Sequence, residues 1–306
     1  MSRTSSVPAD GARGTRPTRR RRPVAYLYIV PSVLVLVAFI VVPLVQTVQY
    51  SFYDWNGIGA STWVGLRNYA SVLTDAQLRN SFLHVFVQLT LYAALPVVLG
   101  LVLTIVLSHA NRLRGMSFFR TVLFLPQVIA SVVVGTIWVS IYSTHGLLNQ
   151  VLTLIGMGGV TRAWLGDYTF ALVAIGFIGT WVNTGLCLVI FLGGVQNIEP
   201  AVFEAARIDG AGPLREFFGV TLPALRGQLA IALTLTVTAT LKSFDIVYVT
   251  TQGGPSNATN VPAFTAFSRA FNTGQVGSAA AVAIVLTVVI MVISWVITRL
   301  QPKEVA

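Results

Sequence analysis

The sequence predicts an all-α integral membrane protein whose chain crosses the bilayer six times. Of its 306 residues, 55% are hydrophobic and only 10% are charged, whereas soluble domains average about 25% charged residues. Six apolar stretches reach the roughly 20 residues that a helix needs to cross about 30 Å of hydrocarbon. We place these spans near residues 24–48, 82–108, 120–142, 169–194, 229–249 and 277–298. Lipid is therefore the expected solvent for a membrane domain covering residues 24–300.

A basic segment precedes the first span. Residues 1–23 are rich in Arg, Ser, Pro, Thr and Gly, so they are too polar to bury a core and are expected to be disordered. A signal peptide is the alternative, with an apolar region of about 7–15 residues and a small-residue cleavage site. The apolar stretch here is longer and continues into Gln46 and Thr47, which favours a retained span.

The basic residues predict the orientation, because cytoplasmic loops of membrane proteins carry an excess of Lys and Arg. If the N-terminus is cytoplasmic, fifteen of the 20 basic residues fall in inside segments, and four, Arg67, Arg79, Arg162 and Arg269, fall in outside loops. The remaining one, Lys242, lies within a span. This asymmetry predicts a multi-pass protein of the bacterial cytoplasmic membrane with both termini inside, the C-terminal segment being residues 301–306.

Charge and cysteine usage argue against several other classes. The net charge of +10 could suggest a nucleic-acid partner. However, seven of the 20 basic residues precede Pro23, and most of the others flank apolar runs. We therefore expect no nucleic-acid partner. Cys187 is the single cysteine, which leaves no disulfide within the chain and no sulfur cluster for zinc or iron. His84, His109 and His145 match no metal-ligand spacing. We expect this chain to bind no metal and no cofactor.

The loop between the fourth and fifth spans, residues 197–223, has a helix–turn–helix pattern. Pro200 suits the first turn of a helix, where a missing N–H costs nothing. Glu204 and Arg207, three residues apart on that helix, are expected to pair on its exposed side. Gly210 and Gly212 permit a left-handed turn that ends the helix, and a second short helix can start at Pro213. A docking surface for another protein and a simple connecting loop are both compatible with this pattern.

The spacing of residues in this loop favours the docking surface. Glu204-Ala205-Ala206 is followed after three residues by Gly210, and after nine more by Val220 and then Leu222-Pro223. The pattern resembles the EAA motif of ABC importer permeases, with one departure, because Val220 stands where Ile is more usual. The resemblance implies a role in ATPase coupling for Glu204, Ala205, Ala206, Asp209, Gly210, Leu222 and Pro223.

Other segments resemble the carbohydrate branch of that family, the maltose/glycerol-phosphate-like permeases. Residues 51–57 and 64–69 look like its first external loop, residues 164–167 like its second, and residues 244–255 like the end of its fifth span and the turn after it. The resemblance runs from about Ala25 to Leu300. It implies a type I ABC importer permease fold that carries a sugar or sugar-like solute.

The resemblance also implies partners. Such an importer contains a second homologous permease subunit, usually non-identical, so that the pair is a heterodimer. Two copies of a cytoplasmic ABC ATPase and an extracytoplasmic solute-binding protein complete it. The segment 197–223 would then be the coupling loop that docks on the ATPase. ATP and Mg²⁺ are expected on the ATPase, because this chain has no Gly-x-x-x-x-Gly-Lys-Ser/Thr loop.

The candidates for the solute path are the few polar and aromatic side chains inside the spans. A hydroxylated solute needs hydrogen-bonding groups at mid-depth and aromatic faces for its rings. The spans offer Gln127, Trp181, Asn183, Lys242, Asp245 and Tyr248. Lys242 and Asp245 are three apart, so a self-neutralising pair on one helix face is the alternative to a solute-facing role. Gln127 and Asn183 could equally form hydrogen bonds between helices.

Two other classes of membrane protein remain as alternatives. A membrane-embedded enzyme would need acids, bases or metal ligands converging at one depth, and the sequence has only ten acidic residues without such a cluster. An ion-coupled secondary transporter usually buries functional carboxylates in its spans, and Asp245, near the end of the fifth span, is a weak candidate for that role. The sequence does not identify the solute.

Overall fold

The computed structural model of this protein describes residues 28–109 and 116–299. Residues 1–46 and 47–306 form two compact units, and each is described by itself. The described part of the first unit is helical from Val30: helix α2 (Val30–Leu36), the π-helix η1 (Val37–Val41) and the beginning of α3 (Val42–Tyr50). The predicted basic tail, residues 1–23, and the C-terminal residues 301–306 lie outside the described residues.

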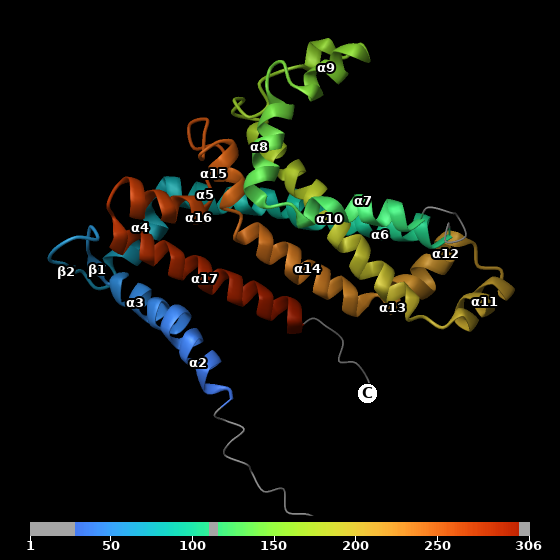
Figure 1. The fold of residues 1–306 in the computed structure, drawn as a ribbon, viewed down its shortest axis with the longest axis horizontal. Coiled ribbons are helices and arrows are strands. Elements are labelled where there is room, and N and C mark those ends of the chain that lie inside the picture. Colours follow the sequence, from blue (N-terminus) through green and yellow to red (C-terminus); the bar gives the residue numbers. More distant parts are fainter. Residues whose placement is uncertain (1–27, 110–115, 300–306) are drawn as a thin grey trace, which may run out of the picture. The chain divides into compact units, whose positions relative to one another are not determined.

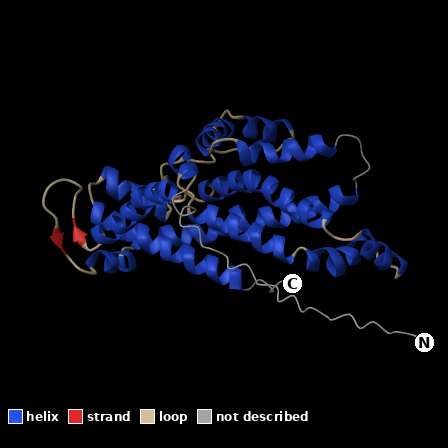
Figure 2. Ribbon diagram, turned by 60° about the horizontal axis from the view of Figure 1, so that its bottom comes forward, coloured by secondary structure: helices blue, strands red, loops and turns tan. Residues whose placement is uncertain are grey.

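The second unit is almost entirely helical (Figure 1). Strands β1 (Tyr53–Asp54) and β2 (Thr62–Trp63) pair antiparallel and are the only strands in the described part of the chain, a small addition to the predicted all-α class (Figure 2). The helices that follow, in chain order, are α4 (Arg67–Thr74), α5 (Ala76–Gln88), η2 (Leu89–Ala94), α6 (Leu95–His109), α7 (Met116–Val128), α8 (Ser131–Tyr142), α9 (Leu147–Leu154), η3 (Gly158–Val160), α10 (Ala171–Gln196), α11 (Pro200–Ile208), α12 (Pro213–Glu216), η4 (Phe217–Thr221), α13 (Leu222–Ala224), α14 (Arg226–Leu241), α15 (Asp245–Thr250), α16 (Pro262–Phe267), η5 (Ser268–Asn272) and α17 (Val276–Arg299).

Length and composition identify the helices that can cross a membrane. Five helical runs among the described residues qualify: Val30–Tyr50, Ala76–Leu107, Ser131–Leu154, Ala171–Gln196 and Val276–Arg299. A sixth is formed if the segment Pro213–Ala224 and helix α14, which meet at a bend of 71°, are taken as one span. The predicted class, an α-helical membrane protein, is therefore confirmed. Two of the predicted spans, 120–142 and 229–249, are not single continuous helices.

Helix α10 is the centre of the second unit. It packs against α6, α7 and α14, and α14 in turn packs against α17. The close approach depends on glycine, because a Cβ atom on Gly185 would lie 2.0 Å from the carbonyl oxygen of Leu123 in α7, and one on Gly100 would lie 2.6 Å from the Cβ of Cys187. Small residues allow this approach between membrane helices, where dispersion rather than hydrophobic burial drives association.

The second span contains a π-helical turn next to Pro96. Because proline has no N–H, Pro96 cannot donate a hydrogen bond to the carbonyl oxygens of Leu91 or Tyr92, five and four residues earlier. Two side chains of α10 replace it: Thr180 Oγ1 donates to the Leu91 oxygen at 2.5 Å, and Asn183 Nδ2 donates to the Tyr92 oxygen at 3.2 Å. A neighbouring helix thus satisfies backbone groups that membrane lipid could not.

The predicted third span, 120–142, is not one helix. It divides into α7 and α8 at Ala130, whose φ of −58° and ψ of 136° are extended. The two pieces have different neighbours, because α7 packs on α10 whereas α8 packs on α15. Figure 1 shows α8 turning away from the bundle of α6, α10, α14 and α17, with α9 at its far end. Tertiary packing therefore divides a stretch whose hydropathy alone predicted a single span.

The predicted fifth span, 229–249, is also interrupted. Helix α14 ends at Leu241 and α15 begins at Asp245, with Lys242 in a turn between them. The two pieces again have different neighbours, because α14 packs on η2 and α17 whereas α15 packs on α8. The interruption places Lys242 and Asp245 on separate elements, so the expected shared helix face does not exist.

Candidate functional site

The segment between α10 and α14 contains the short helices α11 and α12, followed by η4 and α13, at the end of the bundle remote from α4 (Figure 1). Pro200 occupies the first turn of α11, as predicted, and Pro213 begins α12 after Gly212, which is its N-cap. None of the nine residues of α11 is buried. The helix is therefore attached to the rest of the chain mainly at its ends, and its sides are available to another protein.

The end of α11 is a Schellman turn centred on Gly210. The N–H of Ala211 donates to the Ala206 oxygen at 2.9 Å, and the N–H of Gly210 donates to the Arg207 oxygen at 3.0 Å. Gly210 has a φ of +77°, the left-handed conformation predicted for it. Gly212 was expected to share that role, which was wrong, because its φ of −72° and ψ of 171° are accessible to any residue.

Arg207 pairs across this turn with Glu216. The pair with Glu204 that the sequence suggested is therefore wrong. The Nε and Nη2 atoms of Arg207 donate to the two carboxylate oxygens of Glu216 at 2.9 and 3.3 Å. The hydrogen bonds and charge of Glu216, with a smaller contribution from Glu204, raise the pKa of Arg207 above its usual value. Glu216 itself is 5% exposed. Arg207 and Glu216 are nine residues apart. Pairing rules for helices consider only spacings of three and four residues, so they could not predict this pair.

The seven residues assigned to ATPase coupling are distributed along this segment. Glu204, Ala205, Asp209 and Gly210 are exposed, whereas Ala206 is half-buried beneath them. Leu222 and Pro223 are half-buried in α13, directly before the 71° bend into α14. The exposed part of the motif is thus on α11 and its C-terminal turn, and the apolar part is at the junction with the span. The coupling role itself stays a prediction.

Asn183 has the most restricted environment among the candidates for the solute path. It is 3% exposed, and its side-chain amide donates a hydrogen bond to the Tyr92 carbonyl oxygen, which Pro96 cannot reach as a donor because it has no N–H. Of the two roles left open for it, the structure shows the hydrogen bond between helices. Gln127 lies on α7 next to Pro126, and its Oε1 atom is buried with no hydrogen-bond partner among the described residues.

The aromatic candidates form two groups of rings. Trp181 on α10 is 40% exposed and meets Trp138 of α8 edge to face, with ring centroids 5.6 Å apart. Tyr248 on α15 stacks on Phe244 at 5.2 Å and contacts Phe267 edge to face at 5.3 Å. Trp181 and Tyr248 are both partly exposed on the surface of the chain.

Lys242 and Asp245 are both exposed and form no ion pair with one another in the described structure. Because the helix is interrupted between them, the self-neutralising pair considered from their spacing is wrong. Both charges lie at a break in a span, where irregular backbone is tolerated next to protein or a water-filled cavity.

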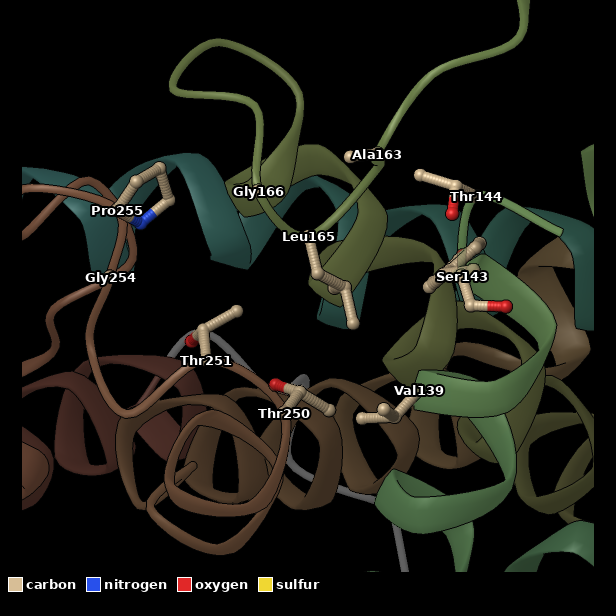
Figure 3. A pocket seen from close by; sticks show the side chains of 11 residues that line it. Val139, Ser143, Thr144, Ala163, Leu165, Gly166, Thr250, Thr251, Gly254 and Pro255 are labelled. Carbon is tan, nitrogen blue, oxygen red and sulfur yellow. The ribbon is translucent and has the colours of Figure 1, made fainter. Parts of the chain in front are cut away.

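A hollow of about 470 Å³ opens between α8, α15 and two loops (Figure 3). Two of the segments noted in the sequence, 164–167 and 253–255, meet here, since Leu165, Gly166, Gly254 and Pro255 line it. Figure 3 shows Val139 of α8 and Thr250 of α15 pointing toward one another across the opening. The complete lining is Val139, Tyr142, Ser143, Thr144, Ala163, Leu165, Gly166, Thr250, Thr251, Gly254 and Pro255, which includes no charged residue.

Comparison with known proteins identifies the family. Residues 97–305 match the family described as the inner membrane component of binding-protein-dependent transport systems. The chain belongs to this family. It is therefore the membrane permease subunit of a binding-protein-dependent ABC importer, a multi-pass protein of the bacterial inner membrane.

Similar permeases agree with this assignment over nearly the whole chain. The diacetylchitobiose uptake system permease protein NgcF of Streptomyces coelicolor is 34% identical, covering 94% of this chain and 86% of its own. The trehalose/maltose transport system permease protein MalF of Thermococcus litoralis is 32% identical, with coverage of 89% and 91%. A crystal structure of a bacterial ABC transporter involved in alginate import has the same fold, with a TM-score of 0.78 at 19% identity and coverage of 92% and 96%.

Proposed function

We propose that this permease carries a sugar or oligosaccharide and that residues 197–223 couple its movement to ATP hydrolysis on a partner subunit. The observation that carries the coupling proposal is the exposure of α11. This nine-residue helix has no buried residue and ends at a left-handed glycine, so nearly all of its surface is open to a partner. Its motif side chains, Glu204 and Asp209 among them, face outward, where an ATPase surface could bind them.

Two kinds of support favour a sugar as the solute. Similar permeases are named for diacetylchitobiose, trehalose/maltose and multiple sugars. The chain also presents the chemistry that sugars require, since the rings of Trp181 and Tyr248 are partly exposed and hydroxyl side chains line the hollow in Figure 3. We propose that Gln127, Lys242 and Asp245 contribute polar contacts along the same path.

The importer that we propose contains a second, non-identical permease and two ATPase subunits that hold ATP and Mg²⁺. An extracytoplasmic binding protein delivers the solute, and both termini of this chain are cytoplasmic. The distribution of basic residues supports the orientation. Reporter fusions after Lys303 should report the cytoplasm, and fusions within residues 145–165 should report the outside. The reverse pattern would place α11 on the wrong side of the membrane for an ATPase.

The decisive experiment is transport by the purified importer in lipid vesicles. The complex would be assembled with its binding protein, and uptake would be measured for a panel of disaccharides and oligosaccharides, with amino acids as the control solutes. We expect ATP-dependent uptake of at least one sugar and stimulation of ATP hydrolysis by the loaded binding protein. Uptake confined to amino acids would overturn the sugar assignment, and sugar uptake that persists without ATP would overturn the coupling.

A further inference from the structure

We infer that the Arg207–Glu216 ion pair is a positioning clamp, which fixes the coupling helix α11 to the arm that leads into the transmembrane helix α14. The inference rests on the proposed coupling role of this segment and assigns to two residues outside the recognised motif the task of holding it. Neither residue is proposed to touch ATP or solute.

The covalent connection between the two elements is poorly suited to transmit a movement. Four residues, 209–212, separate α11 from α12, and two of them are glycines. Gly210 and Gly212 have no atom within 4 Å of the position of a Cβ, so apart from the hydrogen bonds of the Schellman turn no side chain packs beside the connection at these two points. Glycine has the widest range of backbone conformations, so this connection would flex if α11 were pulled by a docked protein.

The ion pair supplies the missing rigidity on the inner side of the turn. A bidentate contact between guanidinium and carboxylate fixes direction as well as distance, since two parallel hydrogen bonds must stay aligned. Its anchor is firm, because Glu216 is 5% exposed and is followed by Phe217, which is also buried. Arg207, on the last turn of α11, reaches that anchor from a side chain that is 59% exposed.

The arm beyond Glu216 connects directly to the membrane domain. It continues through η4 and α13 and meets α14 at the 71° bend. Leu225, at that junction, is completely buried against the core that includes Phe191 of α10. A displacement of α11 held by the clamp would therefore act on α14, whereas a displacement of a free α11 would be absorbed at the glycines.

The test uses the complete importer in lipid nanodiscs or vesicles and measures solute molecules imported per ATP hydrolysed. Arg207→Glu should lower this ratio about tenfold, within the range of interaction energies for groups in one ion-pair network, while assembly with the ATPase is retained. The exchanged pair, Arg207→Glu with Glu216→Arg, should recover most of the loss. Arg215→Glu is the matched control, because it reverses the same charge at an exposed neighbouring position and should leave the ratio unchanged.

A second variant covers the case in which charge reversal prevents assembly. Glu216→Gln keeps the shape of the side chain and one acceptor oxygen, and it should lower the ratio by a smaller factor. An unchanged ratio in both Arg207→Glu and Glu216→Gln, or a loss in Arg215→Glu as large as in Arg207→Glu, would overturn the clamp. Failure of the exchanged pair to recover any coupling would also count against it.

Gly210→Val distinguishes a failure of the clamp from a failure of the proposed coupling role. If Gly210→Val uncouples transport while Arg207→Glu does not, the segment couples the ATPase without the clamp, and only the clamp is wrong. If Gly210→Val and all the ion-pair variants keep full coupling, the segment is a connector, and the proposed coupling role fails together with the clamp.

Discussion

Helix α10 and the segment α11–α12 follow one another in the chain and use glycine for opposite reasons. Gly185 of α10 has ordinary helical geometry, but a Cβ there would lie 2.0 Å from a backbone oxygen of α7. Gly210 at the end of α11 has no atom within 4 Å of a Cβ position, but its φ is +77°. Space limits the first position, and backbone conformation limits the second.

The two regions are stabilised in different ways. In α10 the stability comes from contact, since fifteen of its residues are buried and α6 and α7 approach its backbone. In α11 no residue is buried, and the shape comes from a turn and an ion pair. We therefore expect substitutions in α10 to impair folding, and substitutions in α11–α12 to impair coupling in a protein that still folds.

The largest effect is expected for Gly185→Ala. The added methyl group meets the Leu123 backbone, which cannot move aside as a flexible side chain would, so the loss of unfolding free energy should exceed about 3 kcal/mol, the upper end for overpacking. The measurement is the yield and thermal unfolding of the purified complex. Gly193→Ala on the same helix is the matched control, because nothing lies within 4 Å of its Cβ position. Equal stability of the two variants would contradict the comparison.

Gly210→Val should have the second largest effect. A β-branched residue in the left-handed region costs about 1–2 kcal/mol, enough to reshape the turn but not to unfold the bundle. We expect normal membrane levels together with loss of substrate-stimulated ATP hydrolysis and uptake. Gly212→Ala places a methyl group at a φ of −72° in open space, so it should leave coupling unchanged and cost only the stability that Ala loses relative to Gly at an N-cap. Full coupling in Gly210→Val would show that the segment tolerates a changed turn.

Asn183→Leu should have a smaller effect, about 0.6–1.7 kcal/mol of stability, the range measured for hydrogen bonds between membrane helices. The variant leaves the Tyr92 oxygen without the partner that compensates for Pro96. Pro96→Ala restores a backbone donor, so Asn183→Leu should cost less in that background. Thermal unfolding of the four proteins in one detergent would measure this coupling. Simple additivity of the two substitutions would contradict the compensation.

Lys242→Met should have the smallest effect on folding, less than about 0.5 kcal/mol, as is usual for exposed positions. Its side chain is exposed at the break between α14 and α15 and forms no ion pair with Asp245. If Lys242 faces the solute path, uptake should weaken while basal ATP hydrolysis and docking of the binding protein persist. Lys242→Arg, which keeps the charge, is the control. Normal uptake by Lys242→Met would remove this residue from the path.

The secondary structure of the coupling segment could be predicted closely, because its signals are local. Pro200 and Pro213 start helices, and Gly210 ends one, for reasons that depend on each residue's own backbone. The partner of Arg207 could not be predicted, since Glu204 and Glu216 are both available in sequence and only the turn decides between them. The same limit applied to Asn183, whose hydrogen-bond partner lies 91 residues away.

Hydrophobicity and residue spacing are properties of the chain alone, and they were enough to predict lipid as the solvent, the all-α class and the family motif. Which apolar stretches remain single helices depends instead on tertiary packing. Stretches 120–142 and 229–249 are as apolar as a span requires, yet each is interrupted. Their halves pack on different neighbours, α7 on α10 and α8 on α15 in the first case, and a straight helix cannot satisfy two diverging contacts.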